Sequence, residues 1–195
     1  MLRFLVKKGS LIACALLLLG STIGAKAQEE EAITFKRSAN APEEIVLGIH
    51  CRSPFSIDWG DGAREEFPAK NYGVDGIRGQ AKGNTIHIYG APQDFIALYL
   101  GNNDKGNSIE ELDITRLKRL RFLHCQNNEL SQLDLSQAFM LEELHLANNH
   151  LKSLDVKHSP RLDMLICHGN EIESLDLSEL NRLMALRCEN NKISA

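Results

Sequence analysis

The second half of the chain repeats one pattern of apolar and polar positions every 21 residues. Each copy reads L-x-x-L-x-[LC]-x-x-N-x-[LI]-x-x-L-D-[LVI], with small departures from copy to copy. A unit of this length cannot close a core alone, so its apolar side chains must be covered by the units before and after it, which predicts a solenoid. Four copies begin at Leu120, Leu141, Leu162 and Leu183, and a looser one begins at Phe95, with four extra residues between Asn103 and Ile109.

The start of each copy predicts a short strand, because its apolar residues fall at alternate positions. Leucines then point inward and the residues between them face the concave side. One such column contains Tyr99, His124, His145, Ile166 and Arg187, and the next contains Ala97, Phe122, Glu143, Met164 and Ala185. Aromatic and apolar side chains among charged ones are typical of interface centres, so we predict ligand binding by Tyr99, Phe122, His124, Glu143, His145, Met164, Ile166 and Arg187.

Two polar columns follow the strands. The first is an asparagine ladder of Asn103, Asn128, Asn149, Asn170 and Asn191. An amide both donates and accepts, so we predict that it satisfies loop backbone groups that the solenoid would otherwise leave buried and unpaired. The second contains Asp113, Asp134, Asp155 and Asp176, and Ser or Thr follows two residues later in three of the four copies. This spacing favours capping of a local turn over calcium binding.

Cysteine occupies the last apolar strand position in three copies, as Cys125, Cys167 and Cys188. These residues align with Leu100 and Leu146, so each thiol is predicted to act as a small buried hydrophobe. Zinc needs converging ligands, whereas a ladder points its side chains in parallel. Parallel side chains also meet the dihedral angle of a disulfide poorly, so we predict a structural ladder of free thiols and leave the partner of Cys51 open.

Between residues 28 and 93 the apolar positions alternate in a different way. The segments EIVLGIHC, PFSIDWG and NTIHIYG carry apolar residues at every second position and are separated by stretches rich in glycine and proline. They predict antiparallel strands, with Asp61 and Gly62 in a hairpin turn. Because the first coil would otherwise expose its core leucines, we expect these strands to form a small β cap.

The first 27 residues have the features of a secretory signal peptide. Arg3, Lys7 and Lys8 precede an apolar stretch, and Ala25-Lys26-Ala27 has the small-residue spacing of a cleavage site. We predict cleavage after Ala27 and a secreted or cell-surface protein, without a transmembrane segment, since no later apolar run approaches ~18 residues. A lipoprotein box at Cys14 is not favoured, because only Gly9 to Ala13 separate it from Lys8.

The net charge of the chain limits the kinds of partner that it can bind. Cleavage removes four of the 22 basic residues and none of the 26 acidic ones, which leaves 18 against 26 and a net charge of −8. An acidic surface without clusters of lysine and arginine argues against nucleic acid as a partner.

The repeat resembles leucine-rich repeats over residues 95–195. A 21-residue unit with cysteine at the third apolar strand position is similar to the cysteine-ladder repeats of internalin J-type bacterial surface proteins, and DWGDG resembles the turn of small β-domains found before such repeats. The resemblance implies a leucine-rich-repeat solenoid, with parallel strands on the concave face and short turns or 3-10 segments on the convex face. It also implies extracellular recognition or adhesion. We expect a signal peptide at 1–27, an antiparallel β cap at 28–93 and about five repeats at 94–195, the last one incomplete.

These features predict an exported module, internalin-like and not an enzyme, that binds a protein or glycan on a host or neighbouring cell. A structural or assembly protein, a truncated relative of a longer adhesin and a metal-dependent enzyme remain alternatives. His124, His145 and Glu143 have the chemistry to hold zinc, but no nucleophile with an oriented base is apparent and an open face does not exclude water. We therefore expect no metal and no cofactor there, and a pH-sensitive contact surface instead.

Two further expectations concern association. The repeat ends without a polar coil over Leu183, Leu186, Cys188 and Ile193, which predicts self-association or docking of a partner, with truncation as the alternative. The concave face covers a few hundred square ångströms, below the ~800 Å² per partner of a standard interface, so we expect weak monovalent binding.

Overall fold

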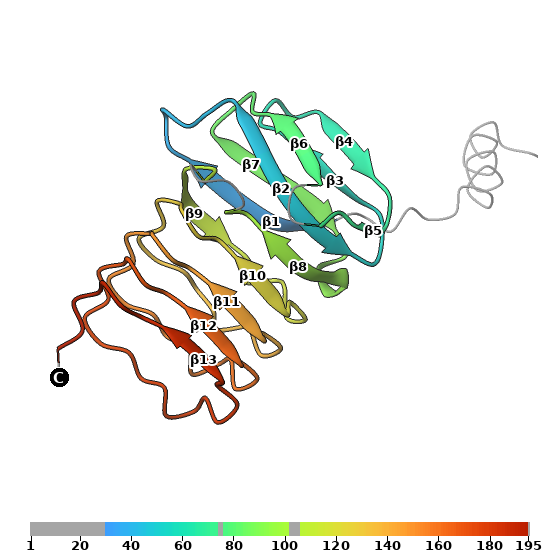
Figure 1. The fold of residues 1–195 in the computed structure, drawn as a ribbon. Helices are drawn as coiled ribbons and strands as arrows, with labels where there is room; N and C mark the ends of the chain where they lie inside the picture. The colour runs from blue at the N-terminus through green and yellow to red at the C-terminus, as the bar shows by residue number, and fades with distance from the viewer. Residues whose placement is uncertain (1–29, 74–75, 102–105, 195) are drawn as a thin grey trace, which may run out of the picture.

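A computed structural model describes residues 30–73, 76–101 and 106–194. Its elements are strands, apart from one 3-10 turn, η1 (Pro92–Asp94). Figure 1 shows a β-sandwich from which short parallel strands step away toward the C-terminal end. Within the described ranges, no helix has the length and apolar character needed to span a bilayer. The predicted signal peptide, its cleavage site after Ala27 and the box at Cys14 lie outside the described residues.

Two sheets make up the fold. The five-stranded sheet is antiparallel and has the order β4 (Arg64–Phe67), β3 (Phe55–Asp58), β7 (Thr85–Gly90), β1 (Glu30–Arg37) and β9 (Ile109–Asp113). The eight-stranded sheet has the order β13 (Ala185–Arg187), β12 (Met164–Ile166), β11 (Glu143–His145), β10 (Phe122–His124), β8 (Phe95–Tyr99), β2 (Glu44–Cys51) and β5 (Lys70–Asn71), and β6 (Ile77–Gln80) also pairs with β2. Strands β8, β10, β11, β12 and β13 are parallel to one another, and β2 is antiparallel to its partners β5, β6 and β8.

The parallel strands follow the 21-residue period. Leu123 lies opposite Leu98 on one side and Leu144 on the other, and the same register continues through Leu165 to Leu186. Leu98, Leu123, Leu144 and Leu165 are fully buried. A strict repeat fixes this register because a slip of one residue would turn the whole leucine column toward solvent. The predicted leucine-rich-repeat solenoid with an N-terminal antiparallel β cap is confirmed.

The three alternating segments form β2, β3 and β7, and β3 is joined to β4 by the DWGDG turn. Asp58 organises this turn, because its Oδ1 accepts the backbone N–H groups of Gly60, Asp61 and Gly62 at 2.8, 3.1 and 3.0 Å. Positive φ angles fall on Gly60 (103°) and Gly62 (80°). A side chain at Gly60 would also meet the backbone of Gly83 at 2.6 Å. The first aspartate of the motif therefore caps the turn, and both glycines are needed for its backbone.

The cap and the solenoid share both sheets. Ile49 on β2 lies opposite Leu98 on β8, and Phe35 on β1 lies opposite Leu112 on β9. Their apolar side chains belong to one continuous core. The domain division at residue 93 stays a prediction. Each of the two sheets contains strands from both sides of this division.

The asparagines lie where the ladder was predicted and serve two coils each. Nδ2 of Asn149 donates to the carbonyl of Leu146 in its own coil at 3.0 Å and to that of Cys125 in the preceding coil at 2.9 Å. Its Oδ1 accepts the N–H of Leu130 at 3.0 Å. Asn170 repeats these contacts one coil further on, with Cys167, Leu146 and Leu151 as its partners. The amide side chains thus hold neighbouring coils together through backbone groups that lack a strand partner.

Asn103 lies outside the described residues, and Asn107 makes the ladder contacts of the first coil. Nδ2 of Asn107 donates to the carbonyl of Leu100 at 2.7 Å and to that of Val46 in the cap at 2.9 Å, and its Oδ1 accepts the N–H of Val46. Asn107 stands two residues before Ile109, just as Asn149 stands two residues before Leu151. The four-residue insertion therefore precedes the ladder position in this copy.

The four cysteines of the described residues are free thiols. Cys125 and Cys167 are fully buried in the column that also contains Leu100 and Leu146, and Cys188 in the last coil is half-buried. Burial raises the pKa of the Cys125 thiol, and together with the neighbouring Cys188 and Glu189 it raises that of Cys167 to about 12. Cys51 is buried in the cap, with Sγ 3.8 Å from the Ser53 hydroxyl. Protonated, buried thiols pack as hydrophobes and react slowly.

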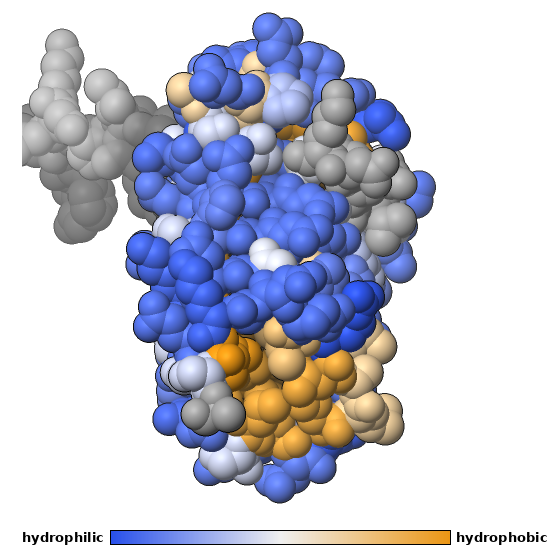
Figure 2. All heavy atoms as spheres, turned by 60° about the vertical axis from the view of Figure 1, so that its left-hand side comes forward, coloured by the Kyte–Doolittle hydropathy of each residue, from blue (hydrophilic) through white to orange (hydrophobic). Residues whose placement is uncertain are grey.

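The last described coil presents apolar side chains to solvent. Met184 is 86% exposed, Leu186 40% and Ile193 41%, whereas Leu165 and Ile172, the equivalents of Leu186 and Ile193 one coil earlier, are buried. Figure 2 shows the resulting apolar patch at this end of the molecule. No other coil of the described residues covers it, and the predicted self-association stays a prediction.

Replacement of Asn149 by alanine should destabilise the chain by about 2–4 kcal/mol, because it leaves buried backbone groups of two coils without partners. Urea unfolding followed by circular dichroism measures the change. Asn181→Ala, at an exposed asparagine, is the matched control and should change the free energy of unfolding by less than about 0.5 kcal/mol. Equal stabilities of the two variants would contradict the assigned role of the ladder.

Candidate binding face

The register of the parallel strands assembles the predicted columns on one face of the sheet. His124 lies opposite Tyr99 and His145, and Ile166 lies between His145 and Arg187. In the neighbouring column Phe122 lies opposite Ala97 and Glu143, and Met164 lies between Glu143 and Ala185. Most of these side chains are half-buried, while Arg187 is exposed. All eight predicted residues therefore share a face, and their role in binding stays a prediction.

Two imidazoles stack at the centre of this face. The rings of His124 and His145 lie 3.8 Å apart between centroids, with an angle of 9° between their planes. The ring of Tyr99 meets that of His124 edge-on at 4.8 Å. Nε2 of His145 lies 3.2 Å from the thioether sulfur of Met164. The sequence predicted that the two histidines are neighbours, and the structure adds the stacked contact.

Burial sets the charge of this cluster. It lowers the pKa of His124 from 6.5 to about 4, and the neighbouring His145 contributes to that shift. Burial also lowers the pKa of His145 and raises that of Glu143, where the nearby Asp163 and Glu142 add to the shift. Both imidazoles are therefore neutral at pH 7. The pKa of His124 is thus well below the ordinary value of histidine, and the expected pH-sensitive contact surface stays a prediction.

Charged side chains flank the apolar part of the face. The guanidinium of Arg121 lies 5.3 Å from the centroid of the Phe122 ring and forms a salt bridge with Glu142. At the far end Arg187 pairs with Glu189 at 2.6 Å. An aromatic and apolar centre with charged groups at its rim is the usual anatomy of a protein interface.

The face also extends onto the cap, which the sequence did not indicate. His50 on β2 lies opposite Ala97 and, on its other side, opposite Asn71 on β5. Gly48 lies opposite Tyr99. The alternation in EIVLGIHC shows that Gly48 and His50 share a side of their strand, but only the antiparallel pairing of β2 with β8 brings that side into the concave face.

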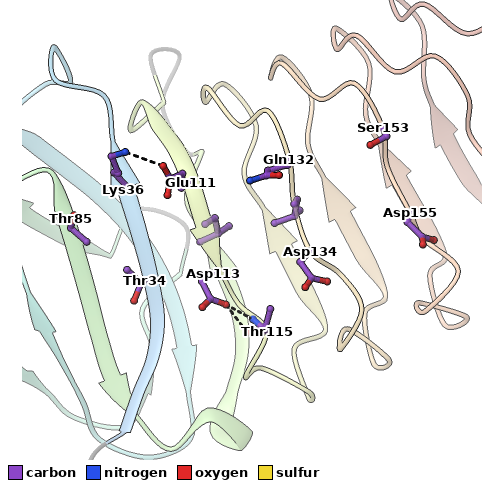
Figure 3. A pocket seen from close by; sticks show the side chains of 12 residues that line it. Thr34, Lys36, Thr85, Glu111, Asp113, Thr115, Gln132, Asp134, Ser153 and Asp155 are labelled. Carbon is purple, nitrogen blue, oxygen red and sulfur yellow. Dashed lines mark hydrogen bonds and ion pairs between the residues drawn. The ribbon is translucent and has the colours of Figure 1, made fainter.

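A groove of about 620 Å³, lined mostly by polar and charged residues, lies away from this face, between β1, β9 and the following turns. Figure 3 shows Asp113, Asp134 and Asp155 along it, together with the ion pair of Lys36 and Glu111. Each aspartate accepts the N–H of the residue two positions later, at 2.8 to 3.0 Å, and Asp176 does the same outside the groove. These carboxylates cap local turns, as predicted.

Parallel strands at a 21-residue period, an asparagine ladder and a buried leucine column define a leucine-rich-repeat solenoid. Its structure is similar to the functional domain of InlJ from Listeria monocytogenes, which includes a cysteine ladder, with 30% identity and a TM-score of 0.44 over 45% of this chain and 19% of that one. It is also similar to an internalin (InlF) of the same species, with 24% identity and a TM-score of 0.47 over 52% of this chain and 30% of that one. A leucine-rich-repeat protein of Leptospira interrogans matches with 20% identity and a TM-score of 0.34, over 42% and 28%.

The similarity to the cysteine-ladder domain of InlJ covers one part of the chain. The chain spans less than a third of the length of each of these proteins. No family model matches the sequence, and the search of curated proteins found no match.

The lowered pKa of His124 makes stability depend on pH. The unfolded chain binds a proton near pH 6.5 that the folded chain takes up only near pH 4, so stability is full above 6.5 and falls as the pH falls through this window. Between pH 7.5 and pH 5 we expect His124 to account for a loss of about 1–2 kcal/mol, after allowance for the solvent that reaches the ring.

Urea unfolding at the two pH values measures this loss. His124→Gln should flatten the dependence on pH, and His158→Gln, at an exposed histidine on the turn side, should leave it unchanged. The same dependence in His124→Gln as in the wild type would show that His124 is not responsible.

Proposed function

We propose that this chain is an exported recognition module that binds a protein through its concave face, in adhesion or host contact. The observation that carries the proposal is the shared face of Tyr99, Phe122, His124, Glu143, His145, Met164, Ile166 and Arg187. Partly exposed aromatic, thioether and aliphatic side chains at its centre can be desolvated by a partner at little cost. A glycan is the alternative ligand, since Tyr99 and the histidines also offer ring faces and polar edges.

Neutral imidazoles support a contact role at neutral pH. A charged histidine would have to lose its hydration when covered, whereas the neutral stacked rings of His124 and His145 add flat, weakly polar surface. Glu143 keeps an acidic group beside them, and its side chain is 33% exposed. A partner with an apolar centre and a basic group near Glu143 fits this arrangement.

The size of the face predicts modest affinity. With β2 and β5 the sheet presents seven strands at ~4.8 Å, and a few outward residues on each give a few hundred square ångströms. This is below the ~800 Å² per partner of a standard interface, so one copy should bind weakly and several copies on a surface should bind strongly.

A second candidate function is assembly. The apolar patch of the last coil, with Met184, Leu186 and Ile193 exposed, is a surface that another copy or a partner can cover. Analytical ultracentrifugation of the wild-type chain distinguishes the two functions, and it also serves as a control for the binding assay. Association that increases with concentration favours assembly, whereas a monomer favours recognition by the concave face.

Phe122→Ala should weaken binding to the partner at least about tenfold, because Phe122 lies at the centre of the face. The matched control is Phe139→Ala, since Phe139 is 42% exposed near His158 on the turn side. Wild type and variants are applied to arrays of extracellular proteins and glycans, and each positive is measured by surface plasmon resonance. Binding that survives Phe122→Ala but not Phe139→Ala would place the site on the other side of the molecule.

A further inference from the structure

Three metal-ligating side chains meet at the centre of the concave face. His124 comes from β10, and Glu143 and His145 come from β11. The parallel register places the two histidines opposite each other, and alternation along β11 turns Glu143 to the same side. One ligand atom from each of the three residues lies within 4.8 Å of the other two. This convergence needs no movement of the backbone.

One buried nitrogen of the cluster, Nε2 of His124, lacks a hydrogen-bond partner in the part of the chain that the structure describes. Nε2 of His124 is inaccessible to solvent and makes no hydrogen bond within the described residues. The nearest carboxylate oxygen, Oε2 of Glu143, lies 3.5 Å away, beyond the length of a good hydrogen bond. A buried nitrogen without a partner costs about 1–3 kcal/mol, so such a group calls for an explanation. A bound cation between the two atoms would supply the missing partner of Nε2.

The donor set and its spacing fit zinc. Two imidazole nitrogens and a carboxylate oxygen form a known three-ligand set for this ion, with bonds of about 2.0–2.2 Å. Tetrahedral geometry then separates ligand atoms by roughly 3.3–3.5 Å. The contact between His124 and Glu143 already has this length, at 3.5 Å. We propose that His124, Glu143 and His145 bind a zinc ion, with its fourth position open to the concave face.

Side-chain rotation completes the site. Stacked rings present their nitrogen lone pairs side by side, so His145 must turn about its Cβ–Cγ bond to face an ion shared with His124. That rotation replaces its contact with the thioether of Met164. The fixed position of His124, whose side chain is only 15% exposed, gives the ion one preorganised ligand.

The charges around the cluster favour a cation. Both imidazoles are neutral at pH 7, because burial lowers the pKa values of His124 and His145, and binding therefore displaces no proton. The pKa of Glu143 is raised by burial and by the negative charges of Asp163 and Glu142. A divalent ion would offset this excess of negative charge. The sequence alone predicted no metal at these residues. The buried unpaired nitrogen and the 3.5 Å spacing now favour a metal site.

The proposed zinc site does not depend on protein binding by the concave face. If it does, the open fourth position gives the ion a water or a carboxylate of the partner as its last ligand. The ion would then lie within the interface, between Tyr99 and Met164.

The test is a titration of the metal-free, full-length mature chain with zinc at pH 7.4, by calorimetry and by competition with a chromophoric chelator. We expect one ion per chain at micromolar concentration. His124→Gln and Glu143→Gln should each weaken binding at least tenfold. His158→Gln, at an exposed histidine elsewhere, is the matched control and should bind as the wild type does.

Imidazole nitrogen NMR provides a second readout. Zinc should shift the ring resonances of His124 and His145 together and leave those of His158 in place, and circular dichroism confirms that each variant is folded. Weak binding of several ions that Glu143→Gln does not change would overturn the proposal. An equal loss in His158→Gln would overturn it as well.

Discussion

The asparagine amide that bridges two coils is the interaction on which the rest of the structure depends. Strands of three residues leave most of each coil outside the sheet, and the backbone groups at the strand ends point into a narrow core. The side chain of Asn149 pairs with four of them, two in its own coil and two in the preceding one. Each buried backbone group without a partner costs about 1–3 kcal/mol, so the amide at this place removes several such penalties in each coil where the ladder contacts are made.

The same interaction joins the repeats to the cap. Asn107 exchanges two hydrogen bonds with the backbone of Val46 on β2, so the ladder continues into the sandwich. The carbonyl of Asn107 in turn accepts a hydrogen bond from the buried Arg37 of β1, at 2.9 Å. With β2 paired to β8 and β1 paired to β9, the cap is rigidly joined to the first coil. This pairing keeps the strands of the concave face in one register and so fixes the backbone positions of the two histidines.

The repeat allowed the sequence to predict register, because a strict period leaves only one alignment of the strands. The two concave columns, the buried Cys125 and the turn-capping aspartates all follow from that alignment. The alignment failed where the period breaks, and the four-residue insertion concealed the role of Asn107. If the copies are aligned backward from Ile109, the apolar residue after the insertion, Asn107 falls at the ladder position.

Other features depend on contacts that no period encodes. The pairing of β2 with β8 is antiparallel and nonlocal, so the place of His50 beside Ala97 could not be predicted. Strand spacing predicted neighbouring histidines, but the stacking of their rings and the unpaired Nε2 of His124 depend on side-chain torsions and on burial by Tyr99 and Glu143. The chemistry of the face is therefore set by packing, while its position is set by the repeat.

Native-state hydrogen exchange of the amides that donate to the ladder tests this account most directly. The N–H groups of Leu130 and Leu151 donate to the side chains of Asn149 and Asn170 at 3.0 Å. If the ladder holds cap and coils in one cooperative unit, these two amides should exchange only through global unfolding, with the same opening free energy as the amides of β1 and β2. Exchange of Leu130 and Leu151 at the rate of exposed loops, while β1 and β2 stay protected, would contradict it.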